Sequence, residues 1–130
     1  MRAEEAAIVQ VVRDANPSNE WNTIEFNICA NVGAYSMDPR WDIDAPGPDD
    51  PQELVLLLMD LRKAMADPEM GAWLTAKIVI PRVGDAHFSY DWMTKPSWDA
   101  IGGELDDPLY QDDLAEFPRT PENIPGWYPC

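Results

Sequence analysis

Residues 21–32 read Trp-Asn-Thr-Ile-Glu-Phe-Asn-Ile-Cys-Ala-Asn-Val, with apolar and polar side chains in alternation. Successive side chains of a β-strand point to opposite faces, so this pattern predicts a strand with one buried face. That face would carry Ile24, Phe26 and Ile28. Residues 31–33, Asn-Val-Gly, predict a turn, and residues 34–43 predict a second strand. Pro39 lies within this second strand and favours an irregular strand or an edge position, because proline cannot donate a ladder hydrogen bond.

A second hairpin is predicted further along the chain. Residues 73–81 alternate again, residues 82–85 (Arg-Val-Gly-Asp) predict a turn, and residues 87–92 predict the return strand. One face of the first strand would carry Leu74, Ala76, Ile78 and Ile80. One face of the second would carry Phe88, Tyr90 and Trp92. For the rings of Trp21, Trp73 and Phe88 we expect packing in the core.

Helical periodicity marks two longer stretches and one short one. Residues 2–15 place Ile8, Val11, Val12 and Ala15 at helical spacing. The clearest helix has an apolar stripe of Leu54, Val55, Leu57, Leu58, Leu61 and Met65. Its expected N-cap is Asp49 or Asp50, with Pro51 in the first turn. A long loop at 94–107 then precedes a short acidic helix at 108–117, with Asp106 or Asp107 as its expected N-cap.

The predicted order is therefore helix, strand, strand, helix, strand, strand and short helix. Antiparallel hairpins separated by a helix are typical of an α+β fold, in which a small antiparallel sheet is covered by helices. The length of 130 residues suits one domain, residues 1–130. Prolines at 118, 121, 125 and 129 indicate a C-terminal tail, residues 119–130, without regular structure.

The charge of the chain limits what it can bind. There are 24 Asp and Glu against 9 Lys and Arg, which gives a formal net charge of −15. Binding to nucleic acid or to anionic lipid would require a basic surface, so both are disfavoured, whereas a basic protein partner is favoured. The N-terminus lacks the apolar stretch of a signal peptide, and the longest apolar run, residues 54–59, is too short to span a membrane. A cytoplasmic protein is expected.

Motifs of known catalytic chemistry are missing from the sequence. The one histidine, His87, lies within a predicted strand, where a structural role is the usual one. Cys29 and Cys130 are not spaced as a metal or redox motif, and Cys29 reads as a thiol within a strand. Asp38, Asp42 and Asp44 partly resemble a calcium loop but lack its central glycine and final glutamate. We expect a protein that is not an enzyme and has no cofactor or metal, although an enzyme that uses carboxylates stays an alternative.

Two segments concentrate acidic side chains beside aromatic ones. The first is Asp38 to Glu53 with Trp41, and the second is Asp99 to Glu116 with Trp92, Trp98 and Tyr110 nearby. Aromatic anchors among carboxylates are typical of protein interfaces, because rings supply contact area and charges supply steering. The same residues can also be explained by structural roles within the fold. The rings would then pack in the core, Asp112 and Asp113 would cap a helix, and Arg119 would pair with Asp91.

Four motifs in the C-terminal half resemble those of a known family. They are Gly71-Ala72-Trp73, Phe88-Ser89-Tyr90-Asp91, the block from Tyr110 to Arg119 that ends in Phe-Pro-Arg, and Ile124-Pro125-Gly126-Trp127. Their order and spacing resemble the YezG-type immunity proteins of bacterial polymorphic toxin systems, in particular actinobacterial members. The resemblance covers roughly residues 54–127. Residues 93–98, Met-Thr-Lys-Pro-Ser-Trp, depart from the more acidic stretch expected there.

The resemblance implies an immunity protein that is not an enzyme. Such a protein binds the toxic C-terminal domain of a secreted bacterial toxin, a nuclease or an enzyme acting on NAD or nucleotides, and covers its active site with an acidic surface. The residues predicted to contact the toxin are Asp91, Trp92, Trp98, Asp99, Glu104, Asp106, Asp107, Tyr110, Asp112, Asp113 and Glu116. The alternative is an acidic adaptor or regulatory protein that binds a basic partner unrelated to toxins.

Overall fold

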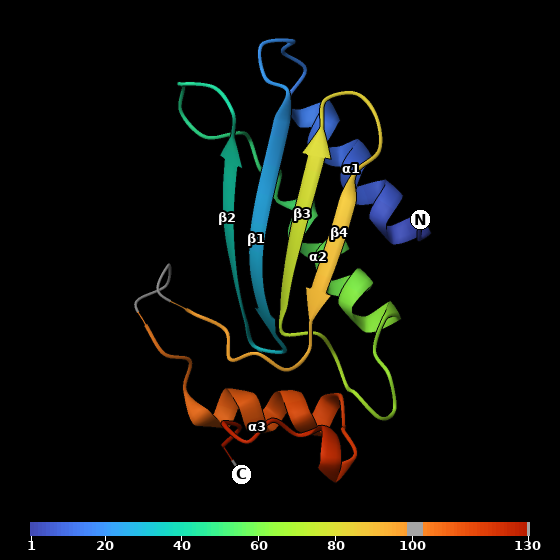
Figure 1. The fold of residues 1–130 in the computed structure, drawn as a ribbon, viewed down its shortest axis with the longest axis vertical. Coiled ribbons are helices and arrows are strands. Elements are labelled where there is room, and N and C mark those ends of the chain that lie inside the picture. Colours follow the sequence, from blue (N-terminus) through green and yellow to red (C-terminus); the bar gives the residue numbers. More distant parts are fainter. Residues whose placement is uncertain (99–102, 130) are drawn as a thin grey trace.

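An antiparallel sheet forms the centre of the computed structural model, which describes residues 1–98 and 103–129. Within these residues the order is helix, strand, strand, helix, strand, strand, helix and a 3-10 turn (Figure 1), so the predicted α+β fold is confirmed. The helices are α1 (Ala3–Ala15), α2 (Glu53–Ala64) and α3 (Asp107–Glu116). The strands are β1 (Thr23–Asn31), β2 (Ala34–Trp41), β3 (Thr75–Pro81) and β4 (His87–Asp91), and the turn is η2 (Pro121–Asn123).

The strand order is β2-β1-β3-β4, so each predicted hairpin is formed and β1 pairs with β3 between them. The central strand β1 pairs on both sides, and Ile28 faces Met37 on one neighbour and Ala76 on the other. Pro39 pairs with Phe26 in the edge strand β2, as predicted, where a missing N–H is tolerated.

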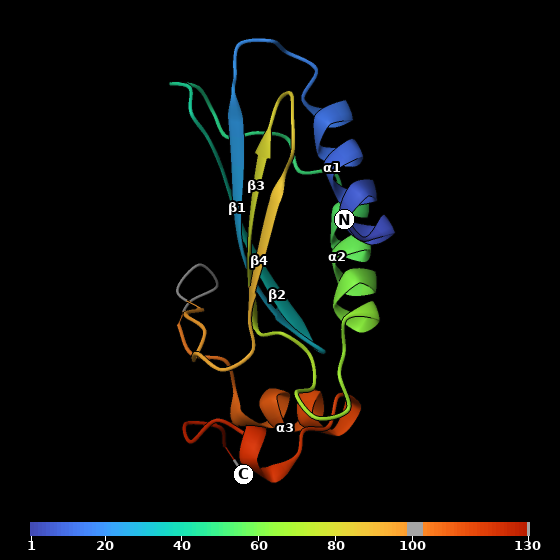
Figure 2. The ribbon, with the colours of Figure 1, turned by 45° about the vertical axis from the view of Figure 1, so that its right-hand side comes forward.

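Both long helices lie on one face of the sheet, and most of the other face is uncovered (Figure 2). The predicted core residues Ile24, Phe26 and Ile28 are 0–2% exposed. They pack with Ile8 and Val12 of α1 and with Leu54, Leu58 and Leu61 of α2 in one hydrophobic cluster. Side chains of the opposite parity are mostly polar, as expected for a sheet that faces solvent on one side.

The start of α2 differs from the prediction. The helix begins at Glu53 after Gln52, and neither Asp49 nor Asp50 is its N-cap. The reason lies in a contact with the end of α1. The buried Asn16 side chain donates to the Asp49 carbonyl oxygen at 3.0 Å and accepts from the Asp49 amide at 2.9 Å, which holds this backbone in the preceding loop.

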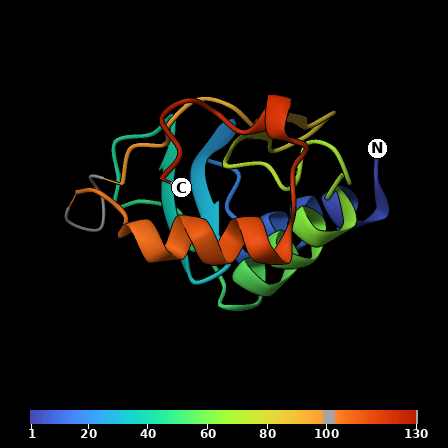
Figure 3. The same cartoon turned by 90° about the horizontal axis from the view of Figure 1, so that it is seen from below.

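The third helix crosses one end of the sheet and closes a second core there (Figure 3). This core consists of Leu74, Trp98, Leu105, Tyr110 and Tyr128. Cys29 and Ala34, from the end of the hairpin nearest α3, pack against it. The tail is therefore tied to the sheet by packing, although η2 is its only helical turn among the described residues. No helix in residues 1–98 or 103–129 is long and apolar enough to cross a membrane.

Gly71 sits where the chain leading to β3 meets the segment after α3. Its φ is +70°, in the left-handed region that favours glycine. A Cβ atom there would lie 2.8 Å from the Phe117 carbonyl oxygen and 2.9 Å from Cγ of Arg119. The close approach of these two segments therefore requires a glycine, which explains the Gly-x-Trp motif in structural terms.

We predict that Gly71→Ala destabilises the protein by more than Gly84→Ala. Both glycines have positive φ, so each alanine adds a backbone cost of about 1–3 kcal/mol. Only at Gly71 does the new methyl group also clash, which adds about 1–3 kcal/mol, since nothing lies within 4 Å of a Cβ at Gly84. Urea unfolding of both variants measures the difference, and equal losses would contradict the clash.

Candidate partner-binding surface

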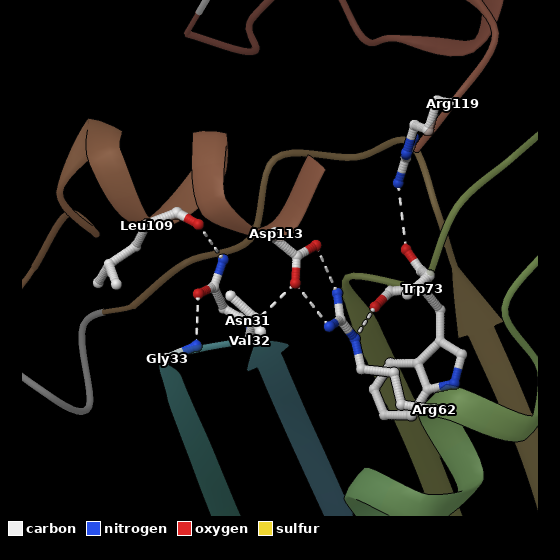
Figure 4. A network of polar contacts seen from close by, with 9 residues as sticks. Asn31, Val32, Gly33, Arg62, Trp73, Leu109, Asp113 and Arg119 are labelled. Carbon is white, nitrogen blue, oxygen red and sulfur yellow. Dashed lines mark hydrogen bonds and ion pairs between the residues drawn. The ribbon is translucent and has the colours of Figure 1, made fainter. Parts of the chain in front are cut away.

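A buried ion pair fixes α3 to the rest of the molecule (Figure 4). Arg62 of α2 donates from Nη1 to Asp113 Oδ1 at 2.7 Å and from Nη2 to Asp113 Oδ2 at 2.8 Å. The two residues are 2% and 3% exposed. Parallel N–H···O bonds of this kind combine charge with a defined geometry. The pair therefore sets the position of α3 relative to α2.

The remaining polar atoms of this pair are also satisfied. Arg62 Nε donates to the Trp73 carbonyl oxygen at 2.8 Å, and Asp113 Oδ1 accepts the Val32 amide at 2.9 Å. The guanidinium lies 5.3 Å from the ring centre of Phe117. Each of these contacts reduces the cost of removing two charges from water. Four segments far apart in sequence meet at this point: the β1–β2 turn, α2, the segment just before β3, and α3.

Two further side chains, those of Asn31 and Arg119, tie the same end together. The buried Asn31 side chain donates to the Leu109 carbonyl oxygen of α3 at 3.0 Å. Arg119 donates to the carbonyl oxygens of Ala72 at 3.2 Å and Asn123 at 3.1 Å. The idea that Arg119 pairs with Asp91 is therefore wrong. Burial lowers the pKa of Arg119, and burial raises the pKa of Tyr128, whose ring lies 5.8 Å from the Arg119 guanidinium, to about 12.

Four exposed acids lie on α3 and at its N-cap, spread around the solvent-exposed part of the helix rather than along one side. We call Asp106, Asp107, Asp112 and Glu116 the acidic face of α3, and all four are exposed. Asp107 lies in the first turn, where the helix dipole stabilises a negative charge. Asp112 and Glu116 lie near the C-terminal end, where the dipole opposes it, and no basic residue occupies the last turn. The acidic face is thus an exposed surface of net negative charge, and Lys95 lies close enough to interact with Asp107.

Three predicted contact residues are not on the surface. Trp98 and Tyr110 are each 2% exposed and belong to the second core, where Trp98 Nε1 donates to Tyr110 Oη at 3.1 Å. Asp113 is buried in the ion pair with Arg62. These three side chains are therefore not part of the exposed surface, because packing of α3 and the segment after β4 against the end of the sheet removes them from solvent.

The other predicted residues are placed as follows. Asp91 ends β4 and accepts the amides of Thr94 and Met93, both at 2.8 Å, and these bonds lower its pKa. Trp92 is half-buried against the first core and stacks obliquely on Tyr90, with ring centres 6.1 Å apart. Glu104 is exposed and pairs with Lys95 at 3.0 Å. Asp99 lies outside the described residues. The exposed members of the predicted set are therefore Glu104 and the acidic face of α3, whereas Asp91 is partly buried at the end of β4.

A hollow of about 550 Å³ lies on the uncovered face of the sheet. Polar side chains from all four strands and from the segment after β4 line it: Asn27, Cys29, Ser36, Asp38, Thr75, Lys77, Ser89, Asp91 and Ser97. Ile28, Ala76 and Tyr90 also line it, although Ile28 and Ala76 are buried in the first core. We call this feature the sheet hollow. Sequence analysis missed it, since it depends on which strands are neighbours.

Two side chains of reactive types, Cys29 and His87, lie near the sheet hollow. The Cys29 thiol donates to the Ser97 carbonyl oxygen at 3.2 Å, and burial raises its pKa, which keeps it in the unreactive protonated form. His87 lies on the outer strand β4 and is exposed. Across the described ranges, no three His, Cys, Asp or Glu side chains are grouped to hold a metal ion.

Arg62 is the other residue that sequence analysis missed. It follows Leu54 and Leu58 at intervals of four, so it lies on the apolar stripe of α2. A charged residue in such a stripe requires a buried partner, which is a signal that the sequence does contain. The identity of that partner, Asp113, depended on the tertiary fold.

Comparison with known proteins adds no assignment. No family model matches the sequence, and no curated protein matches it. The likeness to YezG-type immunity proteins therefore rests on the four motifs quoted above.

We predict that Asp113→Ala and Asp112→Ala have very different effects on stability. Removal of the buried carboxylate leaves Arg62 charged and unpaired, which costs about 3–5 kcal/mol. Removal of its exposed neighbour changes the free energy of unfolding by at most about 0.5 kcal/mol. Denaturant unfolding monitored by tryptophan fluorescence compares the two, and similar midpoints would contradict a structural role for the ion pair.

Proposed function

We propose that this protein is an immunity protein that binds and neutralises the toxic C-terminal domain of a cognate secreted bacterial toxin. The observation that carries the proposal is the acidic face of α3, which is exposed on its outer side and held from within by the buried Arg62–Asp113 pair. A surface that is already fixed loses little conformational entropy when a partner binds. Such a surface suits an inhibitor, which must bind tightly without changing shape.

The chemistry of inhibition follows from charge. Nucleases and enzymes that act on NAD or nucleotides hold phosphates with basic residues. The carboxylates of α3 can occupy the same basic groups and so exclude the anionic substrate. The net charge of −15 accelerates the encounter with a basic cleft, because opposite charges steer association. In this proposal the protein is not an enzyme, needs no cofactor, and acts in the cytoplasm of the cell that makes the toxin.

The family motifs divide into structural and surface parts. Gly71 admits the segment after α3, the Trp73 carbonyl accepts from Arg62, and Asp113 and Arg119 of the block at 110–119 tie α3 and the tail to the sheet. These motifs therefore support a shared way of mounting α3. The acids that would contact the toxin lie beside them on the outer side of the helix, where the partner rather than the fold determines the residue.

Co-expression with the toxic domain encoded beside its gene tests the proposal directly. We expect the protein to restore growth of cells that produce this domain and to co-purify with it. Failure of both would overturn the proposal. Capture of a basic partner unrelated to toxins would support the adaptor alternative instead.

Charge reversal on α3 is predicted to weaken the complex. In the triple variant Asp106→Lys, Asp112→Lys and Glu116→Lys, the association rate should fall about 10-fold or more at low ionic strength. The effect should shrink above about 0.1 M salt, where charges separated by more than 10 Å are screened. Asp112→Lys and Glu116→Lys suit the helix dipole, whereas Asp106→Lys at the N-cap opposes it, so the helix content and unfolding of the variant are measured by circular dichroism beside its binding.

The matched control reverses three exposed acids of the loop between β2 and α2, which lies at the opposite end of the sheet (Figure 1). The control variant is Asp44→Lys, Asp49→Lys and Asp50→Lys, with the same change in net charge. Surface plasmon resonance should show a much smaller decrease for the control. Equal decreases would mean that only net charge matters and that α3 is not the contact surface.

A further inference from the structure

The free edge of β2 is a binding feature of a different kind from the acidic face of α3. In the part of the chain that the structure describes, β2 pairs with β1 and no strand lies along its other side (Figure 1). The direction of its main-chain groups follows from the ladder of β1. Ala30 donates to the Leu74 carbonyl oxygen at 3.0 Å, so even-numbered residues of β1 bond toward β3 and odd-numbered residues bond toward β2.

Every second residue of β2 therefore points its main-chain N–H and C=O away from the sheet. Ser36 and Asp38 lie opposite odd-numbered residues of β1 and join its ladder. Tyr35 and Met37 lie opposite even-numbered ones, so their main-chain groups face outward. Pro39 occupies the next outward position, where its missing N–H removes no ladder bond. The edge thus presents a row of main-chain donors and acceptors that β1 does not use.

A groove of about 610 Å³ runs beside this edge, between the first half of β2 and the start of α2. Residues 33–37 form one wall, and the other consists of Asp50, Pro51, Gln52 and Val55. Tyr35 is 47% exposed, and Val55 is partly buried but belongs to neither hydrophobic core. We call this feature the β2 groove. It offers an occupant both outward main-chain groups and apolar side chains.

Main-chain groups that recur at every second residue match an extended polypeptide. Their spacing along a strand is about 7 Å, which is also the spacing of the complementary groups on a second strand. A strand added here would place alternate side chains over Pro51 and Val55, where apolar contact is available. Its other side chains would point toward the uncovered face of the sheet. The β2 groove is therefore suited to strand addition.

Charge and position favour the toxin domain over a second copy of this chain as the source of that strand. Asp50 supplies charge to the lining, and Gly33 at one end of the β2 groove packs against Leu109 of α3. Asp112 and Glu116 follow Leu109 at intervals of three and seven, so they lie on the same side of α3. The groove is thus continuous with exposed acids, which favours a strand with basic residues. Two copies of this chain, each with a charge of −15, repel each other.

We infer that an extended, basic segment of the toxin domain binds in the β2 groove and adds a fifth strand to the four-stranded sheet. This inference rests on the proposed function and gives it a mode of binding. Main-chain pairing at Tyr35 and Met37 supplies affinity, and the acids of α3 determine which end of the segment lies beside them. Pairing stops at Pro39, which has no N–H to donate.

Two substitutions at one position separate the main chain from the side chain. Tyr35→Pro removes an outward N–H and the exposed ring but no bond to β1, as Pro39 already shows further along the strand. Tyr35→Ala is the matched control, since it removes the ring and keeps the N–H. Titration calorimetry with the toxic domain encoded beside the gene should show binding by Tyr35→Pro about 10-fold weaker than by Tyr35→Ala. Equal affinities would overturn the inference.

A second pair of variants tests the opposite wall. Val55→Arg fills the β2 groove and places a cation where a basic strand would lie, so binding should weaken by at least about 10-fold. Leu56→Arg is its control, because Leu56 is 67% exposed on the same helix, does not line the groove and gives the same change in charge. The same affinity in both variants would contradict strand addition.

Amide hydrogen exchange of the wild type, followed by NMR, reports on the edge directly. In the free protein the amides of Tyr35 and Met37 should exchange faster than those of Ser36 and Asp38, which bond to β1. The toxic domain should slow Tyr35 and Met37 by at least about 10-fold. Protection of these two amides by a dimer of this chain alone would overturn the inference in favour of a second copy. If the toxic domain binds and both amides stay fast, the proposed function stands and the inference falls; if it does not bind, both fall.

Discussion

The bidentate pair of Arg62 and Asp113 is the interaction on which the end of the molecule depends. Only Tyr110 and Asp113 of α3 are buried, so apolar packing of this helix is small for its length. Leu109 and Leu114 also pack against the second core but are only partly buried, so the hydrophobic preference of α3 for one position on the sheet is weak. The ion pair supplies a stronger preference, because Asp113 can satisfy its charge only where it meets Arg62 and the Val32 amide together.

This pair determines position more than it adds net stability. Burial of two charges costs several kcal/mol per ion, roughly what their attraction and hydrogen bonds return. The cost of any alternative placement is far larger, because each charge would be buried without a partner. Three bonds converge on Asp113 from two directions, so small displacements of α3 would break at least one of them. A helix mounted in this way can present exposed acids in a constant arrangement, which an inhibitor needs.

The sequence predicted the fold well where local patterns carry the information. Alternation at residues 21–32 identified β1, its buried face and the turn after it, because strand periodicity is a property of neighbouring residues. The edge position of β2 followed from Pro39 for a similarly local reason. The predicted N-cap of α2 was wrong, because Asn16 holds the backbone of Asp49 in the preceding loop. Asn16 comes close to Asp49 only when the chain folds.

The candidate surface was harder to predict for the same reason. A run of acids and aromatic rings after β4 looks uniform in sequence, yet the structure places Trp98 and Tyr110 in a core and Asp112 in solvent. Which side of α3 faces inward depends on Arg62, which comes from a helix about fifty residues earlier. The sheet hollow likewise depends on the order of the strands, in which β1 lies between β2 and β3. The residue pattern within one strand does not predict which strands are its neighbours.

The positions of the acids along α3 indicate whether these side chains serve folding or binding. Asp113 and Glu116 lie in the last turn of α3, where the dipole disfavours negative charge at a cost of about 0.3–1 kcal/mol for an exposed residue, and Asp112 immediately precedes that turn. Arg62 neutralises only Asp113, the one that faces inward. Basic residues at the two exposed positions would give a more stable helix without disturbing any contact in the core. Residues that oppose stability at surface positions are typical of functional sites, where binding rather than folding determines the side chain. The exposed acids of α3 therefore favour a role in contact with a basic partner over a role in the fold.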